Sequence, residues 1–235
     1  MPFTASHPAA VLIGASALAR WGLPIPALVI GSIAPDLFTV LPIPEVVHFA
    51  HTPWGLVTAD VAIGVAAFVV WQAFFAPALI AIAPKALGAR VPLRDLERPV
   101  WWRVALAVLL GAATHLVWDS FTHDWMWGTQ HIGWLAERHG PFLGFQWVQK
   151  VSDVVGLAIV TAWVAARWRA APVCPDTTVM SLRYRMLAWF AILGPATVTF
   201  CLLLPRDSFY VAITTAAGLG LIGLTGVAGI RALKP

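Results

Sequence analysis

The chain has 235 residues, of which 60% are hydrophobic and only 11% are charged, and its mean hydropathy is +0.80. Ordinary globular domains are about 25% charged, so this chain has too few polar residues to cover the surface of a water-soluble globule. Its formal net charge of +4 comes from basic residues in short connections between apolar runs, with no patch interleaved with aromatic residues. These features exclude a soluble protein, argue against a nucleic-acid partner and point to membrane topology as the role of the basic residues.

Two short apolar stretches come first, at residues 8–19 and 26–41. As a helix the first stretch would cover about 18 Å, which is too short for a hydrocarbon core of about 30 Å. We therefore expect a short N-terminal helical hairpin with its turn at Pro24 and Pro26. The first seven residues have no Lys or Arg, unlike a cleaved secretory signal, so we expect this end to be retained.

Five longer apolar runs follow, at residues 55–83, 101–121, 151–166, 186–204 and 209–230. Each reaches or approaches the roughly 20 residues that a helix needs to cross a membrane. The runs lack the alternation of barrel strands, and helices satisfy their own backbone groups in lipid. We therefore expect an all-α, polytopic membrane helical bundle with five long transmembrane helices, five to seven crossings and a single domain over residues 1–235.

Lys and Arg gather around three connections, at residues 85–103, 167–185 and 231–234. If each long helix crosses the membrane once, all three connections fall on one side. The positive-inside rule makes that side cytoplasmic. We therefore expect a multi-pass protein with a cytoplasmic C-terminus, and with residues 123–150 outside.

The most informative motif ends the second long run, at His115-Leu-Val-Trp-Asp119-Ser-Phe-Thr-His123. Spacings of four place His115 and Asp119 on one helical face, and Asp119 and His123 likewise. Counted from Arg103, His115 lies about 18 Å and Asp119 about 24 Å along the helix, in the outer half of the membrane. Ionisable groups are costly at that depth, which makes them functional candidates. A hydrogen-bonded pair that joins two helices is the structural alternative.

Other candidates fall at the same level by the topology argument: His7, Asp36, His48, His51 and Asp60. The chain has two cysteines and no CxxC pair, so imidazole and carboxylate groups must hold any metal. Such ligands suit zinc and also manganese or iron. Asp36 also fits a helix cap, Asp60 fits an ordinary carboxylate at a helix start, and His48 and His51 compete for one role.

Three segments carry a family resemblance: Met1-Pro-Phe-Thr-Ala-Ser-His7-Pro-Ala-Ala-Val, Gly31-Ser-Ile-Ala-Pro-Asp36 and Gly111-Ala-Ala-Thr-His115-Leu-Val-Trp-Asp119-Ser-Phe-Thr-His123. They resemble the bacterial family called domain of unknown function 4184, over most of the chain. This resemblance implies a location in the bacterial cell (inner) membrane. More distantly, an early His, a Pro-Asp, a following His and a late His-x-x-x-Asp resemble the membrane-bound metal-dependent hydrolases and the zinc-dependent phospholipase C group.

The phospholipase resemblance implies a ligand set for a divalent metal, zinc as the first choice, with one or two ions. By matching positions, His7 would bind one ion, a second ion would be bound by Asp36, His51 (or His48) and His115, and Asp119 would bridge. The chain departs from that group after Asp119, because no further His-x-x-x-Glu pair follows, so a third metal is not expected.

Together these features predict a metal-dependent hydrolase at the outer membrane interface. Its substrate would be a lipid or a lipid-linked molecule cleaved at a phosphate ester, ester or amide, and His123 and Asp60 are candidates for acid and base roles. A transporter or channel that uses the same residues as a proton or metal path is the first alternative, although the inner halves of the runs have few polar residues. A non-catalytic membrane scaffold is the second.

Overall fold

The computed structural model describes residues 4–40, 44–90, 99–173, 180–206 and 209–232. The connections at 91–98, 174–179 and 233–235, which carry part of the topology argument, lie outside the described residues. Within the described part the chain is helical apart from one two-stranded hairpin, which confirms the all-α prediction.

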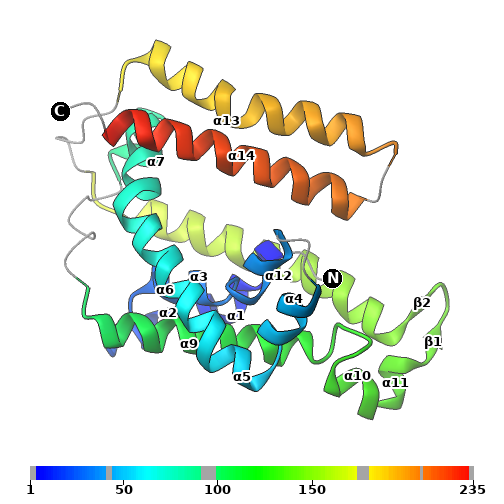
Figure 1. The fold of residues 1–235 in the computed structure, drawn as a ribbon. Helices are drawn as coiled ribbons and strands as arrows, with labels where there is room; N and C mark the ends of the chain where they lie inside the picture. Colours follow the sequence, from blue (N-terminus) through cyan, green and yellow to red (C-terminus); the bar gives the residue numbers. More distant parts are fainter. Residues whose placement is uncertain (1–3, 41–43, 91–98, 174–179, 207–208, 233–235) are drawn as a thin grey trace. The chain divides into compact units, whose positions relative to one another are not determined.

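The N-terminal quarter of the chain consists of short helices, in agreement with the predicted short N-terminal helical hairpin (Figure 1). In chain order they are the 3₁₀ helix η1 (Thr4–Ser6), α1 (Pro8–Ile13), α2 (Ala15–Arg20), α3 (Ile25–Gly31), the 3₁₀ helix η2 (Pro35–Val40), α4 (Pro44–Ala50) and α5 (Pro53–Gly55). The turn between α2 and α3 contains Gly22 at a φ of 75° and Pro24 at the cap of α3.

Among the described residues, five helices are long and apolar enough to cross a membrane. The first runs from Pro53 to Ile82 as α5, the π turn η3 (Leu56–Asp60), α6 (Val61–Val70), the π turn η4 (Trp71–Phe75) and α7 (Ala76–Ile82). The others are α9 (Trp101–Asp119), α12 (Gly144–Ala170), α13 (Leu182–Leu203) and α14 (Phe209–Ala232), and the short α8 (Lys85–Gly88) follows α7. These helices match the five predicted runs.

The predicted boundaries differ most from the observed ones at the third long helix. The third long helix begins at Gly144, well before the predicted start at Val151. Its first two turns contain Gln146, Gln149 and Lys150, which interrupt the apolar run without breaking the helix. Ahead of it lie α10 (Trp127–His131), α11 (Gly133–Ala136) and the antiparallel hairpin of β1 (Arg138–His139) and β2 (Phe142–Leu143).

The chain forms two compact units, residues 1–68 with 98–167 and residues 69–97 with 168–235. In the first unit α3 lies against α9 (Figure 1). A Cβ on Gly111 would collide with the Leu28 carbonyl oxygen, and one on Gly31 with that of Val108. The two backbones are therefore in direct contact. The prediction of a single membrane domain stays a prediction.

In the second unit α13 and α14 lie side by side and pack on α7 (Figure 1). Ile82, Ala188, Ile192 and Val227 form their shared core. The indole of Trp189 donates a 3.0 Å hydrogen bond to the Ile82 carbonyl. This unit contains none of the candidate site residues, which all belong to the first unit.

Candidate metal centre

The last turn of α9 carries two of the predicted ligands. His115 and Asp119 are 1% and 0% exposed, and His115 Nε2 lies 3.1 Å from Asp119 Oδ2. Their spacing of four residues puts them on one helical face. The opposite side of that turn holds Val117 and Trp118, which are exposed.

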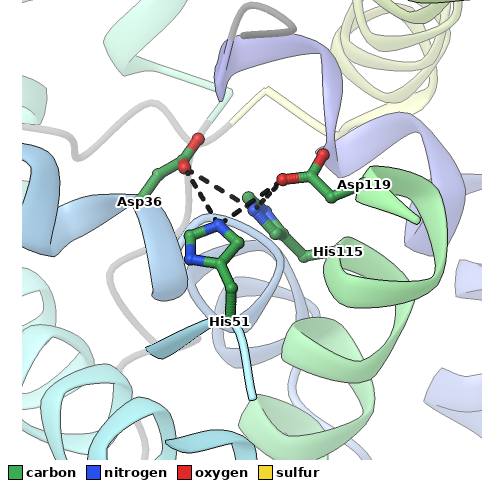
Figure 2. A group of neighbouring side chains, drawn as sticks. All are labelled: Asp36, His51, His115 and Asp119. Atoms are coloured by element: carbon green, nitrogen blue, oxygen red, sulfur yellow. Dashed lines mark ion pairs between the residues drawn. The ribbon is translucent and has the colours of Figure 1, made fainter. Parts of the chain in front are cut away.

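Two other segments bring a histidine and a carboxylate to this pair (Figure 2). Asp36 is the second residue of η2, and His51 directly follows α4. His51 Nε2 is 3.5 Å from Asp119 Oδ2 and 3.8 Å from Asp36 Oδ1, and His115 Nε2 is 3.6 Å from Asp36 Oδ1. One ligand atom from each of Asp36, His51, His115 and Asp119 lies within 4.8 Å of the others. We call these four buried residues the ligand cluster.

Both histidines of the ligand cluster are oriented by backbone carbonyls. His115 Nδ1 is 2.8 Å from the Ser32 carbonyl oxygen, and His51 Nδ1 is 2.8 Å from that of Val47. A carbonyl only accepts hydrogen bonds, so each Nδ1 carries the proton and donates it. Each Nε2 therefore turns toward the carboxylates, which is how proteins orient metal-binding imidazoles.

Hydroxyl groups orient both carboxylates in the same way. Thr4 Oγ1 donates to Asp36 Oδ2 at 2.6 Å, and Thr122 Oγ1 donates to Asp119 Oδ1 at 3.3 Å. The other oxygens, Asp36 Oδ1 and Asp119 Oδ2, are those that approach His51 and His115. Sequence reasoning missed both threonines, because a hydroxyl beside a carboxylate has no characteristic spacing.

His7 and His123 flank Asp119. His7 Nε2 lies 3.6 Å from Asp119 Oδ1, and its ring stacks on His115 with centroids 3.9 Å apart. His123 Nδ1 lies 3.4 Å from Asp119 Oδ2. Asp119 thus presents a different oxygen to His7 than to His115 and His51.

The segment that carries His7 is held against α12. Ser6 Oγ donates to Asp153 Oδ1 at 3.4 Å. A Cβ on Gly156 would lie 2.7 Å from the Ser6 Cβ, so the two segments touch directly. This contact fixes the residue that precedes His7.

The protonation of the flanking histidines follows from their surroundings. Burial and the neighbouring His115 lower the pKa of His7 to about 4, and burial lowers the pKa of His123. Burial also opposes the charged form of His51, but its contacts with Asp119 and the Val47 carbonyl outweigh burial, and the pKa of His51 is raised. At pH 7 His7 is neutral and has a lone pair for a metal ion.

The ligand cluster fits a divalent metal ion. Among the described residues, His51 Nε2, His115 Nε2 and Asp119 Oδ2 are buried without a hydrogen-bond partner, although buried polar atoms are nearly always paired. A divalent cation would satisfy all three at once. Imidazole with carboxylate is a donor set for zinc, manganese or iron.

The remaining predicted residues lie around the ligand cluster. Asp60 ends the π turn η3, is 0% exposed, and has no hydrogen-bond partner for either oxygen among the described residues. His48 is exposed, and its ring meets Trp125 edge-on at 4.8 Å. Of the two competing histidines, His51 is the one in the ligand cluster.

Comparison with known proteins assigns the chain to a family. No curated protein and no solved structure matches the chain. A family match covers residues 1–231 and so includes every residue of the site. The chain belongs to the family described as a domain of unknown function (DUF4184).

Proposed function

We propose that this protein is a membrane-embedded, metal-dependent hydrolase of the bacterial inner membrane, and that it acts at the outer interface. Its substrate is a lipid or a lipid-linked molecule that is cleaved at a phosphate ester, an ester or an amide. One or two divalent ions, zinc first among them, are held by the ligand cluster together with His7. His123 and Asp60 are the acid and base candidates.

One observation carries the proposal: donor atoms from three separate segments of the chain meet within 4.8 Å. Ligands of a single zinc ion lie about 2.0 to 2.2 Å from it, so an ion needs this convergence. A hydrogen bond between two helices needs only one pair of groups. The oriented Nε2 atoms and carboxylate oxygens add the arrangement that a metal site requires.

The bound ion would supply Lewis acidity and a more acidic water. The residues of the chain have separate roles around it. Asp36, His51 and His115 hold the ion, and Asp119 joins that set to His7 through its second oxygen. His123 Nδ1 lies 3.4 Å from Asp119 Oδ2, which keeps His123 beside the ligand cluster as an acid and base candidate.

A location of the site at a membrane interface is supported by its position at one end of α9 and by the aromatic residues near both ends of that helix. The ligand cluster includes the end of α9 opposite to Arg103. Exposed tryptophans lie near both ends of α9, namely Trp101, Trp102, Trp125 and Trp127, where interfacial belts place them. Lipid is therefore the nearest source of substrate.

The packing below the ligand cluster argues against a proton or metal path. Along α9 toward Arg103, the residues Val104, Val108 and Ala112 are apolar and 0% exposed. The direct backbone contact of α3 with α9 closes the same region. A path would need polar groups or water there.

Metal analysis of purified variants tests the proposal. Asp119→Asn keeps the shape of the side chain but removes the charge that meets four histidines, so bound metal should fall by more than about tenfold. Asp124→Asn is the control, because Asp124 is exposed and five residues further along. Elemental analysis after mild chelation gives the metal content. Equal metal in both variants would remove Asp119 from the metal site.

A further inference from the structure

The candidate ligands are enclosed, and His123 is the most exposed of the buried histidines and carboxylates around them. Asp36 and His51 are each 5% exposed, His7 is 4% exposed, and His123 reaches 7%. A metal ion or substrate therefore cannot reach the ligand cluster until some side chain moves.

The indole of Trp125 lies against the side of the ligand cluster that His51 and His123 form. Its ring meets His123 and His51 edge-on, with centroids 5.8 Å apart in each case. A third edge contact joins it to His48 at 4.8 Å. Trp125 is 36% exposed, so one part of the indole faces the histidines and another part faces the surroundings.

The side of the ligand cluster toward α3 is closed by backbone. Gly31 and Gly111 have no room for a Cβ, and Leu28 and Val108 are 0% exposed. Opening that side would separate two helices that pack along their length. Moving one side chain on the side that His51 and His123 form costs far less.

Trp125 is placed where its side chain can turn while its backbone stays fixed. It lies in the non-helical turn between α9 and α10. Gln130 Nε2 donates to the Trp125 carbonyl at 3.1 Å, and Thr129 N donates to Ser120 O at 3.2 Å. Rotation of the indole therefore breaks the three ring contacts and no helical hydrogen bond.

We infer that Trp125 covers the entrance to the metal centre, so that metal and substrate reach the ligand cluster by displacing its indole. This inference rests on the proposed metal-binding function. It also restricts the substrate, because an entrance beside an interfacial indole admits the polar head of a lipid while its chain stays in the membrane. The bond that is cleaved then belongs to the head group.

Metal exchange tests the cover. Purified full-length protein is loaded with Co²⁺, and uptake and chelator-induced release are timed for wild type, Trp125→Phe and Trp125→Ala. In Trp125→Ala both rates should rise about tenfold, the scale expected when the ring contacts of the closed state are lost, with a nearly unchanged Kd. Trp125→Phe should lie between. Trp134→Ala is the control, because Trp134 is also exposed but its ring stacks on His139.

Chemical labelling tests the same cover without metal. In metal-free protein, diethyl pyrocarbonate should modify His51 and His123 faster in Trp125→Ala than in wild type, as measured by mass spectrometry, while exposed His131 is modified equally in both. Unchanged labelling together with unchanged metal exchange would refute the cover. Faster release with unchanged uptake would also refute it, because Trp125 would then only stabilise bound metal.

The outcomes separate this inference from the proposed function. Wild-type protein that binds no Co²⁺ contradicts the metal centre itself, and with it the inference that Trp125 covers this centre. Wild-type protein that binds Co²⁺ with the same kinetics as Trp125→Ala contradicts the cover alone.

Discussion

At the scale of single residues, the ligand cluster depends on groups that do not belong to it. Ser32 and Val47 contribute only their carbonyl oxygens, yet these determine which nitrogen of each histidine faces the carboxylates. Thr4 does the same for Asp36 with its hydroxyl. Such outer partners hold the donor atoms in place before an ion arrives.

Thr4→Val should therefore weaken metal binding although Thr4 is not a ligand. Valine keeps the shape of the side chain but leaves Asp36 Oδ2 without the Thr4 donor, and loss of an outer partner typically costs about 10- to 100-fold in metal affinity. Titration of purified protein with zinc against a competing chelator gives the affinity.

Thr114→Val is the matched control. The Thr114 hydroxyl donates to the Gly111 carbonyl of its own helix at 2.7 Å, and Thr114 is adjacent to His115 in the chain. Its replacement should leave the affinity within about threefold of wild type, since no ligand loses a partner. Equal affinity in Thr4→Val and Thr114→Val would show that Asp36 does not need its hydroxyl partner.

Spacing and residue chemistry predicted the histidines and carboxylates but not the groups that orient them. The face shared by His115 and Asp119 follows from helix periodicity, and the convergence of Asp36 with that face follows from topology. The choice between His48 and His51 could not be predicted from the sequence. The two are only three residues apart: His48 lies on α4, and His51 directly follows it. Only the end of α4 decides which of them turns inward.

At the scale of elements, the contact of α3 with α9 positions the site. Ser32, which holds His115, directly follows α3, and Asp36 lies four residues further. The two helices approach closely because Gly31 and Gly111 lie where they meet. A change in this contact should therefore alter the positions of the donor atoms in the ligand cluster.

Gly111→Ala should destabilise the protein and loosen the site together. The new Cβ would collide with the Leu28 carbonyl oxygen, and added atoms in a packed interface typically cost about 1–3 kcal/mol. We expect a lower thermal midpoint in detergent and weaker zinc binding, measured on the same preparation.

Gly14→Ala separates this effect from the general effect of replacing glycine. A Cβ on Gly14 would make only ordinary contacts, the nearest at 3.8 Å, and the φ of Gly14 is −91°. This variant should keep both the thermal midpoint and the zinc affinity. A Gly111→Ala protein that behaves like Gly14→Ala would contradict a role for the close contact in positioning His115.

The long helices could be predicted from apolar length, and their details could not. The start of α12 could not be predicted from apolar length. Its first turns contain Gln146, Gln149 and Lys150, and a count of apolar residues misses a helix that continues through polar ones. The π turns η3 and η4 rotate the faces of the first long helix in a way that a 3.6-residue period does not anticipate. The buried position of Asp60 lies at the end of one of them.

At the scale of the whole molecule, the side of the membrane that the site faces depends on the direction of the helices. Basic residues gather at the connections that follow the first and third long helices and at the C-terminus. The segment from α10 to β2, between the second and third long helices, lies on the opposite side of the membrane if each helix crosses once. The ligand cluster and Trp125 lie next to this segment from α10 to β2.

Reporter fusions test this topology. A reporter after Pro235 should be cytoplasmic, and one inserted at Gly140 should be external, because short loops rich in Lys and Arg remain inside. Gly140 is a suitable insertion point because it is exposed, has a φ of 70° and forms the turn between β1 and β2, and loop tips tolerate insertion. Activity of paired reporters that work only inside or only outside the cell gives the side of each position. An external C-terminus would place the metal centre on the cytoplasmic side, and the substrate would then be a lipid of the inner leaflet.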